Sequence, residues 1–529
     1  TRKESSAASD VYKRQPHGRV VKTARTWAVA LTGVDGHMVE VEADISNQTP
    51  DFKIIGLPDK SLGEAVQRVH NACKNTALDL PRRRLTVNLS PASLPKQGAG
   101  FDLSIAVAAL AAGGALSSRS IARVVHLGEL GLDGRLRPVP GVLPSVFAAA
   151  RAGFDTVIVP WGNEAEARLV PGIEVRPAAS LSQVAVWHGA EVDVLEADPV
   201  AAAAVARERP EELDLADVVG QENAVRALIV AAAGGHHMML SGPPGAGKTM
   251  LARRLPGILP SLTEDEALEV ASIRSLTGDS VQALDVMPPL ESPHHSASVA
   301  ALVGGGTRSV RPGAISRAHR GVLFLDEAAE FSRVALDAMR QPLESGVIEV
   351  SRAGITALFP ARFQLIVALN PCPCGNYGVR GAECVCPSLA IRRYSTRLSG
   401  PLRDRIDVEL HVSRVSASQA MVGDRTGMTS EIARALVIEA RERAGARWRG
   451  TPWLRNSEVP GARLRQLDLR IPADARAPLD RALERGTLTL RGYDRVLRLA
   501  WTMADLAGLD RPGRDEVGQA LFLKRGYAS

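Results

Sequence analysis

The feature that most constrains the fold is a glycine-rich segment between an apolar strand and a helix. Residues His237–Leu240 are predicted to end a buried strand, and Met250–Leu255 to begin a helix. The segment between them has the pattern G-x-x-x-x-G-K-[ST], in which backbone N–H groups wrap phosphate oxygens at a helix N-terminus. This strand–loop–helix unit predicts a nucleotide-binding α/β core with a parallel sheet. The predicted phosphate-binding residues are Gly242, Pro243, Pro244, Gly245, Ala246, Gly247, Lys248 and Thr249.

Lys248 stands out because the chain contains very few lysines. Of 64 basic residues only nine are lysine, and after Lys96 the sequence contains just Lys248 and Lys524. A GC-rich genome explains the general preference for arginine, but it does not explain a lysine at this position. Lys248 would place a compact ammonium between the β- and γ-phosphates, where the planar guanidinium of arginine fits poorly. Thr249 would offer its hydroxyl to Mg²⁺.

Two further apolar runs end in polar side chains that suit ATP hydrolysis. Gly321–Glu327 ends in two carboxylates. Asp326 is expected to hold Mg²⁺, directly or through water, and Glu327 to polarise the attacking water as general base. A strand followed by a capped helix is the alternative explanation for the two acids. The run Leu365–Leu369 ends in Asn370, whose amide would orient the same water.

Two arginines downstream are candidates for contacts with the γ-phosphate. Arg405 lies in the segment Leu402–Asp407 and is able to reach the phosphate of a neighbouring subunit. Arg491 begins a helix in the last part of the chain and is able to reach the same phosphate from a lid. Judged alone, each arginine is more commonly a surface residue.

Four of the five cysteines are clustered, which excludes the disulfide framework of a small secreted protein. Two C-x-C pairs are separated by nine residues, and together they comprise Cys372, Cys374, Cys384 and Cys386. Four thiolates fit a tetrahedral structural Zn²⁺ site, although the C-x-C spacing is tighter than the usual two-residue gap. Reduced thiols and a redox-active or disulfide pair are the alternatives. A zinc-bound loop would be able to present Arg380 to DNA.

Length and patterning predict about three domains in this 529-residue chain. The last 114 residues of the sequence, 416–529, carry 20 basic and 14 acidic side chains, so the net charge of +6 resides there.

No apolar run is long enough for a membrane span, and no signal pattern precedes the first domain, so we expect a cytoplasmic protein without a membrane partner. The expected segments are an artefactual or disordered extension (1–23), an α+β domain (24–190), a linker (191–213), the nucleotide-binding core (214–415), a connection (416–430) and a helical domain (431–529).

The sequence from Ala24 to Tyr527 resembles the AAA+ ATPases, and specifically the magnesium-chelatase-like ComM/YifB family. The most specific matching stretches are Ser292–Gly306, Arg311–Glu327, Asn370–Gly375, Leu398–Asp407 and Leu490–Leu506. The resemblance implies an AAA+ P-loop core with an α-helical C-terminal lid. It implies ATP and Mg²⁺ as cofactors and self-association into a ring, expected to be a hexamer, with ATP between subunits.

Roles for single residues also follow from this resemblance. Arg405 matches the arginine finger that acts in trans, Arg491 matches the sensor-2 arginine of the lid, and Asn370 matches sensor 1. The segment around Gly346–Gly354 is similar to a pre-sensor hairpin, which in related motors faces the pore and touches DNA.

The N-terminal block resembles the Lon protease domain, which has a ribosomal S5 domain 2-like fold. The position of the Lon nucleophile is occupied by Gly100, and that of the catalytic lysine by Leu143. A serine–lysine dyad needs both groups, so the resemblance implies a fold retained without proteolysis. Ser90, Ser93 and Lys96 are nearby, and a rewired dyad is the alternative.

The function that these features favour is an ATP-driven ring motor acting on DNA. The resemblance implies helicase or branch-migration activity on recombination intermediates during natural transformation, with single-stranded or branched DNA as partner. The alternative is the ATPase motor subunit of a metal chelatase. An ATP-dependent protease is disfavoured by Gly100 and Leu143, and a non-motor scaffold is a further alternative.

Overall fold

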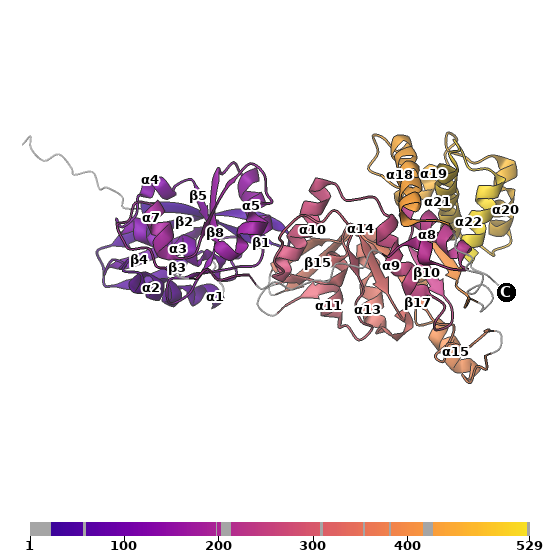
Figure 1. Cartoon of the computed structure of the whole chain (residues 1–529), viewed down its shortest axis with the longest axis horizontal. Helices are drawn as coiled ribbons and strands as arrows, with labels where there is room; N and C mark the ends of the chain where they lie inside the picture. Colours follow the sequence, from indigo (N-terminus) through magenta and orange to yellow (C-terminus); the bar gives the residue numbers. More distant parts are fainter. Residues whose placement is uncertain are drawn as a thin grey trace, which may run out of the picture. The chain divides into compact units, whose positions relative to one another are not determined.

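The computed structural model describes residues 23–56, 60–196, 198–202, 213–306, 310–352, 355–379, 382–415 and 427–525. The chain forms two compact units (Figure 1). The second unit contains everything after residue 202 together with the short segments 31–35 and 140–144. The expected extension before residue 23, much of the expected linker and connection, and Arg380 lie outside the described residues.

The first unit is built on a seven-stranded mixed sheet in the order β3-β4-β2-β1-β5-β8-β9. β1, β5, β8 and β9 run parallel to one another, whereas β2 and β4 are antiparallel. Along β4 every second residue is buried, so one face of this part of the sheet is turned to the core. The strands are β1 (Thr23–Thr32), β2 (Asp35–Ser46), β3 (Asp51–Ile55), β4 (Arg84–Ser90), β5 (Val124–His126), β8 (Thr156–Pro160) and β9 (Glu174–Ala178), with the small pair β6 (Glu129–Leu130) and β7 (Leu136–Arg137).

Helix α3 (Asp102–Ala112) is the core helix of this unit, because its sequence is apolar on all sides and every one of its residues is buried. Its charged residue, Asp102, pairs with Arg68 at 2.6 Å. Burial raises the pKa of Asp102 to about 6, although the hydrogen bond from Arg68 opposes this shift. The other helices are α1 (Lys60–Gly63), α2 (Ala65–Asn75), α4 (Ser118–Ile121), α5 (Val142–Arg151), α6 (Glu164–Ala167) and α7 (Leu181–Trp187).

The residues near the protease-like positions have structural contacts. Lys96 is fully buried, and its Nζ donates to the backbone carbonyl oxygens of Gly56, at 3.0 Å, and Pro91. Burial also lowers the pKa of Lys96. The hydrogen bonds of this ammonium therefore stabilise backbone carbonyls rather than activate a serine.

The second unit contains a five-stranded parallel sheet in the order β11-β14-β17-β10-β18. The strands are β10 (Met238–Ser241), β11 (Leu290–Glu291), β14 (Val322–Leu325), β17 (Gln364–Leu369) and β18 (Val408–His411). In register, Ser241 of β10 faces Leu369 of β17, and Leu325 of β14 faces Val367 of β17. The polar residues that follow these strands therefore meet at the carboxyl edge of the sheet, where α/β proteins bind ligands.

Helices precede and connect the strands of this sheet along the chain. They are α8 (Glu222–Gly234), α9 (Lys248–Ile258), α10 (Glu264–Thr277), α11 (Val299–Val303), α12 (Ala314–Arg317), α13 (Arg333–Ala338), α14 (Arg340–Ser345), α15 (Ser388–Ser395) and α16 (Gly400–Arg403). Two antiparallel pairs complete this part: β12 (Gly304–Gly305) with β13 (Arg311–Pro312), and β15 (Val347–Arg352) with β16 (Ile355–Pro360). The second pair is the hairpin expected near Gly346–Gly354, and residues 353–354 lie outside the described residues.

The C-terminal helices gather at one side of the second unit (Figure 1). They are α18 (Ser430–Arg447), α19 (Gly461–Leu464), α20 (Ala473–Glu484), α21 (Leu490–Ala507) and α22 (Arg514–Arg525). One continuous hydrophobic cluster joins them to α8, α9 and the sheet, with Trp448 and Trp501 among its largest buried side chains. Among the described helices, none has the length and apolar character that crossing a membrane requires.

Candidate active site

The predicted phosphate loop leaves β10 and enters α9 as the sequence indicates. Gly242 passes so close to Val412 that a Cβ would lie 2.1 Å from its carbonyl oxygen. Gly245 and Gly247 have φ of +76° and +90°, a region that L side chains rarely adopt. The glycines of the motif are therefore required by close packing and by backbone conformation, and α9 begins directly at Lys248.

Lys248 lies within the loop, and only 8% of it is exposed. Its Nζ donates to the carbonyl oxygens of Gly242 at 2.7 Å and Pro243 at 3.0 Å, and to Oδ1 of Asn370 at 3.0 Å. Burial lowers the pKa of the ammonium, and the charges of Asp326 and Glu327 oppose that effect. Asn370 and Lys248, 122 residues apart in the sequence, thus meet over the loop.

Thr249 and Asp326 form a pair of oxygen ligands. The hydroxyl of Thr249 donates to Oδ2 of Asp326 at 2.7 Å. Mg²⁺ prefers hydroxyl, carboxylate and phosphate oxygens, so this donor set fits the ion and leaves positions for phosphates and water. These two residues would hold Mg²⁺, which when bound neutralises charge that develops on the phosphates.

Glu327 has a strained backbone conformation. Its φ of +49° and ψ of +44° lie in the left-handed region, which is rare for a side chain of this size. Its backbone N–H donates to Oδ1 of Asp326 at 2.9 Å, and its side chain is 53% exposed. The carboxylate is therefore turned out of the strand to where water can reach it.

His295 was not identified as a site residue from the sequence, yet it lies beside this carboxylate. Its Nδ1 is 3.6 Å from Oε2 of Glu327, and its ring packs against that of His294. The only sequence signal for this contact is that His294 and His295 are adjacent. Two neighbouring imidazoles do not indicate which carboxylate either of them will contact in the fold. Glu327, but not His295, lines a cavity of about 430 Å³, whose other lining residues are 244–250, Asp326 and 368–370.

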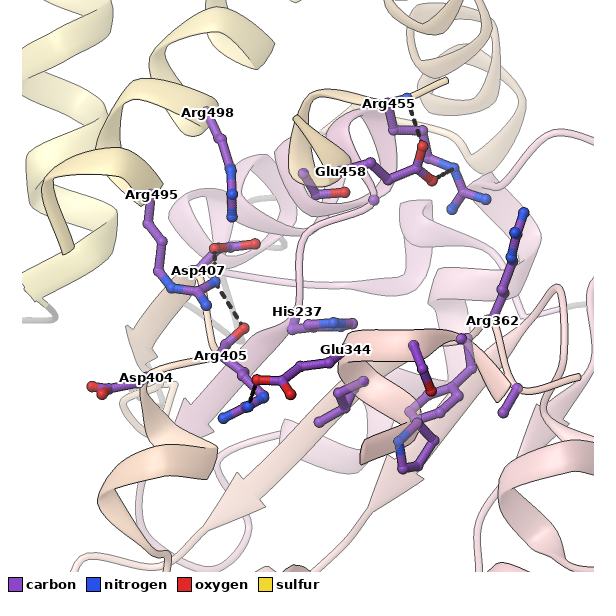
Figure 2. A pocket seen from close by; sticks show the side chains of 18 of the residues that line it. His237, Glu344, Arg362, Asp404, Arg405, Asp407, Arg455, Glu458, Arg495 and Arg498 are labelled. Atoms are coloured by element: carbon purple, nitrogen blue, oxygen red, sulfur yellow. Dashed lines mark hydrogen bonds and ion pairs between the residues drawn. The ribbon is translucent and has the colours of Figure 1, made fainter. Parts of the chain in front are cut away.

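The two predicted arginines do not line the cavity around Lys248. Both line a second cavity, of about 550 Å³. Arg405 is seen there in Figure 2 with four more arginines that line the cavity, Arg362, Arg455, Arg495 and Arg498. Arg405 forms an ion pair with Glu344, and its Nε is buried without a hydrogen-bond partner among the described residues. Arg491 is 78% exposed and lies 3.7 Å from Asp404. The structure thus places Arg405 and Arg491 together and apart from the phosphate loop.

Arg495 and Asp407 form the buried contacts that position the residues lining this second cavity. Arg495 donates from Nη1 to Oδ1 of Asp407 and, at 3.0 Å, to the backbone carbonyl oxygen of Arg405 (Figure 2). The second carboxylate oxygen of Asp407, Oδ2, lies 3.0 Å from Nδ1 of His236. Nε2 of the same histidine lies 2.8 Å from the hydroxyl of Thr502. Burial acts to raise the pKa of Asp407, but Arg495 and His236 hold it well below its ordinary value. A buried polar chain therefore ties α21 to the backbone of Arg405.

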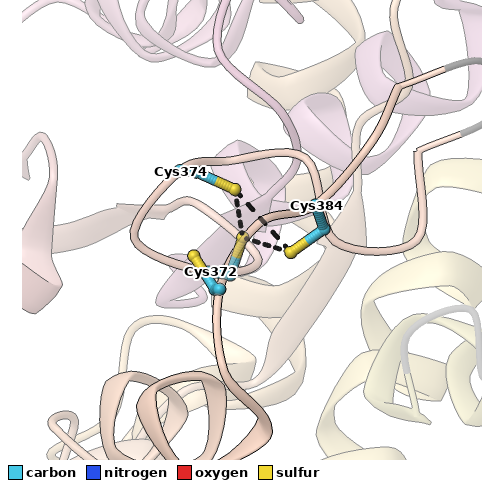
Figure 3. A group of neighbouring side chains, drawn as sticks. Cys372, Cys374 and Cys384 are labelled. Atoms are coloured by element: carbon cyan, nitrogen blue, oxygen red, sulfur yellow. Dashed lines mark hydrogen bonds between the residues drawn. The ribbon is translucent and has the colours of Figure 1, made fainter.

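The four clustered cysteines also come together, in the loop between β17 and α15 (Figure 3). All four Sγ atoms lie within 4.8 Å of one another. None of the four is in a disulfide, which would require two sulfurs at about 2.05 Å.

Comparison with known proteins assigns the family. The family model for magnesium chelatase, subunit ChlI, matches residues 214–420, that for subunit ChlI of Mg-chelatase matches 41–163, and that for the C-terminal part of subunit ChlI matches 427–524. The uncharacterized protein Rv2897c of Mycobacterium tuberculosis is 48% identical over 511 residues, which cover 95% of this chain and 98% of that protein.

Two further relatives also match over nearly their whole length. Competence protein ComM of Haemophilus influenzae is 41% identical over 505 residues, covering 94% of this chain and 96% of ComM. The uncharacterized protein YifB of Escherichia coli is 39% identical over 494 residues, covering 93% and 95%. These matches imply an ATPase that uses ATP and Mg²⁺. The chain belongs to the ComM/YifB family of magnesium-chelatase-like AAA+ ATPases.

Proposed function

We propose that this protein is a cytoplasmic ring-forming motor that hydrolyses ATP to move on DNA and drives branch migration of recombination intermediates during natural transformation. The observation that supports a ring is that the predicted catalytic residues are divided between two cavities of one chain. The cavity around the phosphate loop has the groups that would bind the nucleotide. The second cavity has the arginines that would stabilise the transition state of ATP hydrolysis. The relationship to a protein named for competence supports the DNA substrate.

Within one subunit, the loop cavity binds the nucleotide. Backbone N–H groups of residues 245–249 wrap the phosphates, and Lys248 exchanges its contacts with loop carbonyls for contacts with phosphate oxygens. Glu327 removes a proton from the attacking water, and Asn370, which bonds to Lys248, orients that water beside the γ-phosphate.

Between subunits, the arginine cavity faces the nucleotide of the neighbouring copy. Arg405 and Arg491 extend to the γ-phosphate of that copy and offset the negative charge of the transition state. Arg495 positions Arg405 through its backbone carbonyl oxygen. Hydrolysis in this arrangement requires at least two subunits, and a closed ring, expected to be a hexamer, satisfies every interface.

The ion pair between Arg405 and Glu344 supports coupling between hydrolysis and movement. Glu344 lies on α14, three residues before the hairpin β15–β16 begins at Val347. When Arg405 turns to a phosphate it must leave Glu344, and this change is transmitted to the base of the hairpin. A hairpin at the ring's pore and the excess of basic residues after residue 416 would then contact the DNA backbone.

The alternative, a motor subunit of a metal chelatase, shares the ATPase chemistry but needs no DNA. The descriptions of the matching family models name magnesium chelatase, and no contact among the described residues favours this alternative over a DNA motor.

The test is ATP-driven movement of a fluorescently labelled four-way DNA junction by the purified chain. We expect strand exchange with ATP and Mg²⁺, and none with a non-hydrolysable analogue or with Glu327→Gln. A ring that hydrolyses ATP but neither binds nor moves DNA would overturn the DNA motor and leave the ATPase assignment standing.

A further inference from the structure

The cysteine loop has the geometry of a site for a single tetrahedral metal ion. The Sγ atoms of Cys372 and Cys374 are 3.4 Å apart, those of Cys372 and Cys384 3.8 Å, and those of Cys374 and Cys384 3.7 Å (Figure 3). Ligands at about 2.3 Å from a central zinc ion lie about 3.8 Å from one another at the corners of a tetrahedron. The sulfurs are thus too far apart for disulfides, and close enough to share one ion.

Backbone and side-chain hydrogen bonds close the loop around these sulfurs. The N–H of Tyr377 donates to Sγ of Cys372 at 3.3 Å, and the N–H of Gly375 donates to the carbonyl oxygen of Cys372 at 2.9 Å. The amide of Asn376 donates to the carbonyl oxygen of Glu383 at 3.3 Å, which joins the two arms of the loop. An N–H directed at a sulfur favours the thiolate, the form that binds metal.

We propose that Cys372, Cys374, Cys384 and Cys386 bind one structural Zn²⁺ ion, and that this ion supports the phosphate loop. Four thiolates form a closed set of soft ligands with no open position, which suits a structural rather than a catalytic ion. A cluster of iron and sulfide would hold the thiolates farther apart than the distances here. Binding releases the thiol protons, so the affinity falls at low pH.

The link to the nucleotide site is a direct packing contact. Gly375, with φ of +80°, lies so close to Pro244 of the phosphate loop that a Cβ would be 2.4 Å from its Cδ. On the other side of the loop, Cys372 follows Asn370 by two residues, and Asn370 accepts a hydrogen bond from Lys248. The metal therefore fixes a segment that contacts the nucleotide site at two points. This part of the proposal rests on the nucleotide site described above.

The first experiment measures metal in the purified full-length chain, by elemental analysis and by zinc release on thiol modification. We expect one zinc per chain in the parent protein and in Cys73→Ala, since Cys73 belongs to the first unit and the cysteine loop to the second. We expect the metal to be lost in the double variant Cys384→Ser, Cys386→Ser. A parent protein without metal, or with iron in place of zinc, would overturn the proposal.

Cobalt gives a readout that does not depend on the stability of a variant. Replacing zinc by Co²⁺ in the parent chain should produce the intense visible absorption of tetrahedral cobalt thiolate. A spectrum of octahedral cobalt without thiolate bands would contradict a four-sulfur site.

The second experiment tests the link, with a fluorescent ATP analogue as the probe. We expect about tenfold weaker binding to the zinc-depleted chain, which corresponds to about 1.4 kcal/mol. Gly375→Ala should weaken binding while zinc remains bound, because its methyl group must displace Pro244. Equal affinity with and without zinc, and in Gly375→Ala, would overturn the link but not the zinc site. A parent chain that binds zinc but no nucleotide would instead contradict the proposed function.

Discussion

The two cavities of the second unit have opposite chemical character. Among the described residues, the cavity around the phosphate loop has one cationic lining residue, Lys248, beside the carboxylates of Asp326 and Glu327. The other cavity contains six arginines and four acidic residues, and it has no glycine-rich loop at a helix N-terminus to wrap a phosphate. For hydrolysis of ATP, the first cavity has the phosphate loop and carboxylates that the second lacks, and the second has the arginines that the first lacks.

Under the proposed function, this difference means that the catalytic unit would be larger than one chain. A developing negative charge on the γ-phosphate needs cationic groups in addition to Lys248 and Mg²⁺. The arginines that would serve are held elsewhere in the same subunit by a buried chain of polar contacts around Asp407. The predictions below separate the contributions of the two cavities.

The largest effect is expected for Arg405→Ala. Turnover should fall by about 10³–10⁵-fold, the range for loss of an arginine finger, while nucleotide affinity stays unchanged, because Arg405 does not line the loop cavity. Steady-state hydrolysis and equilibrium binding of a fluorescent nucleotide measure the two quantities.

Mixing variants tests whether the cavities act across subunits. Equal amounts of Arg405→Ala and Lys248→Ala should recover part of the activity, because some interfaces then combine an intact arginine cavity with an intact loop. A mixture as inactive as either variant alone would show that the cavities do not cooperate between chains.

Lys248→Ala should weaken nucleotide binding by about 10²–10⁴-fold, since it removes charge-assisted hydrogen bonds worth about 1.5–3 kcal/mol each. Lys248→Arg should not restore binding, because the guanidinium cannot fit where the ammonium lies between loop carbonyls. Calorimetric titration with ATP measures the change. Lys524→Ala is the matched control, since Lys524 donates to Ile406 and Glu409 and does not line the loop cavity.

Glu327→Gln should retain nucleotide binding and lower turnover by about 10²–10⁴-fold, the range for loss of a general base. Phosphate release under saturating ATP is the measurement. Normal hydrolysis by this variant would remove Glu327 from the mechanism and direct attention to His295, its neighbour at 3.6 Å.

The smallest effect is expected for Arg491→Ala. Turnover should fall by about tenfold, because the side chain is largely exposed and water screens its charge. Thermal unfolding should be unchanged, whereas Arg495→Ala should lower the unfolding temperature, since it leaves Asp407 buried without its guanidinium partner. Equal loss of stability in both variants would mean that Arg491 has a structural role as well.

Much of the loop cavity could be predicted because its signals are local in the chain. An apolar run that ends in Asp326 and Glu327, and another that ends in Asn370, indicate two strands with polar carboxyl ends. Parallel pairing then brings those ends to one edge of the sheet, as the register of β14, β17 and β10 shows. The hairpin β15–β16 was also predicted at its observed place.

Other features could not be predicted, because they depend on packing between distant segments. His295 contacts Glu327, and Gly375 contacts Pro244. Both pairs are far apart in the sequence, and no sequence pattern predicts either contact. The strain at Glu327 is likewise a property of the folded turn, since any residue after a strand has the same local pattern.

The sequence by itself determined the phosphate loop, the carboxylates at the strand ends and the family, since each depends on residue types at short, fixed spacings. Only the tertiary structure decided that Arg491 shares a cavity with Arg405 instead of lying at Lys248. The physical reason is that α21 packs against α8, α18 and α22 within one large hydrophobic cluster, and that the buried contacts of His236 and Asp407 hold it there. That packing fixes the direction of the helix, and with it the place of every arginine that the helix carries.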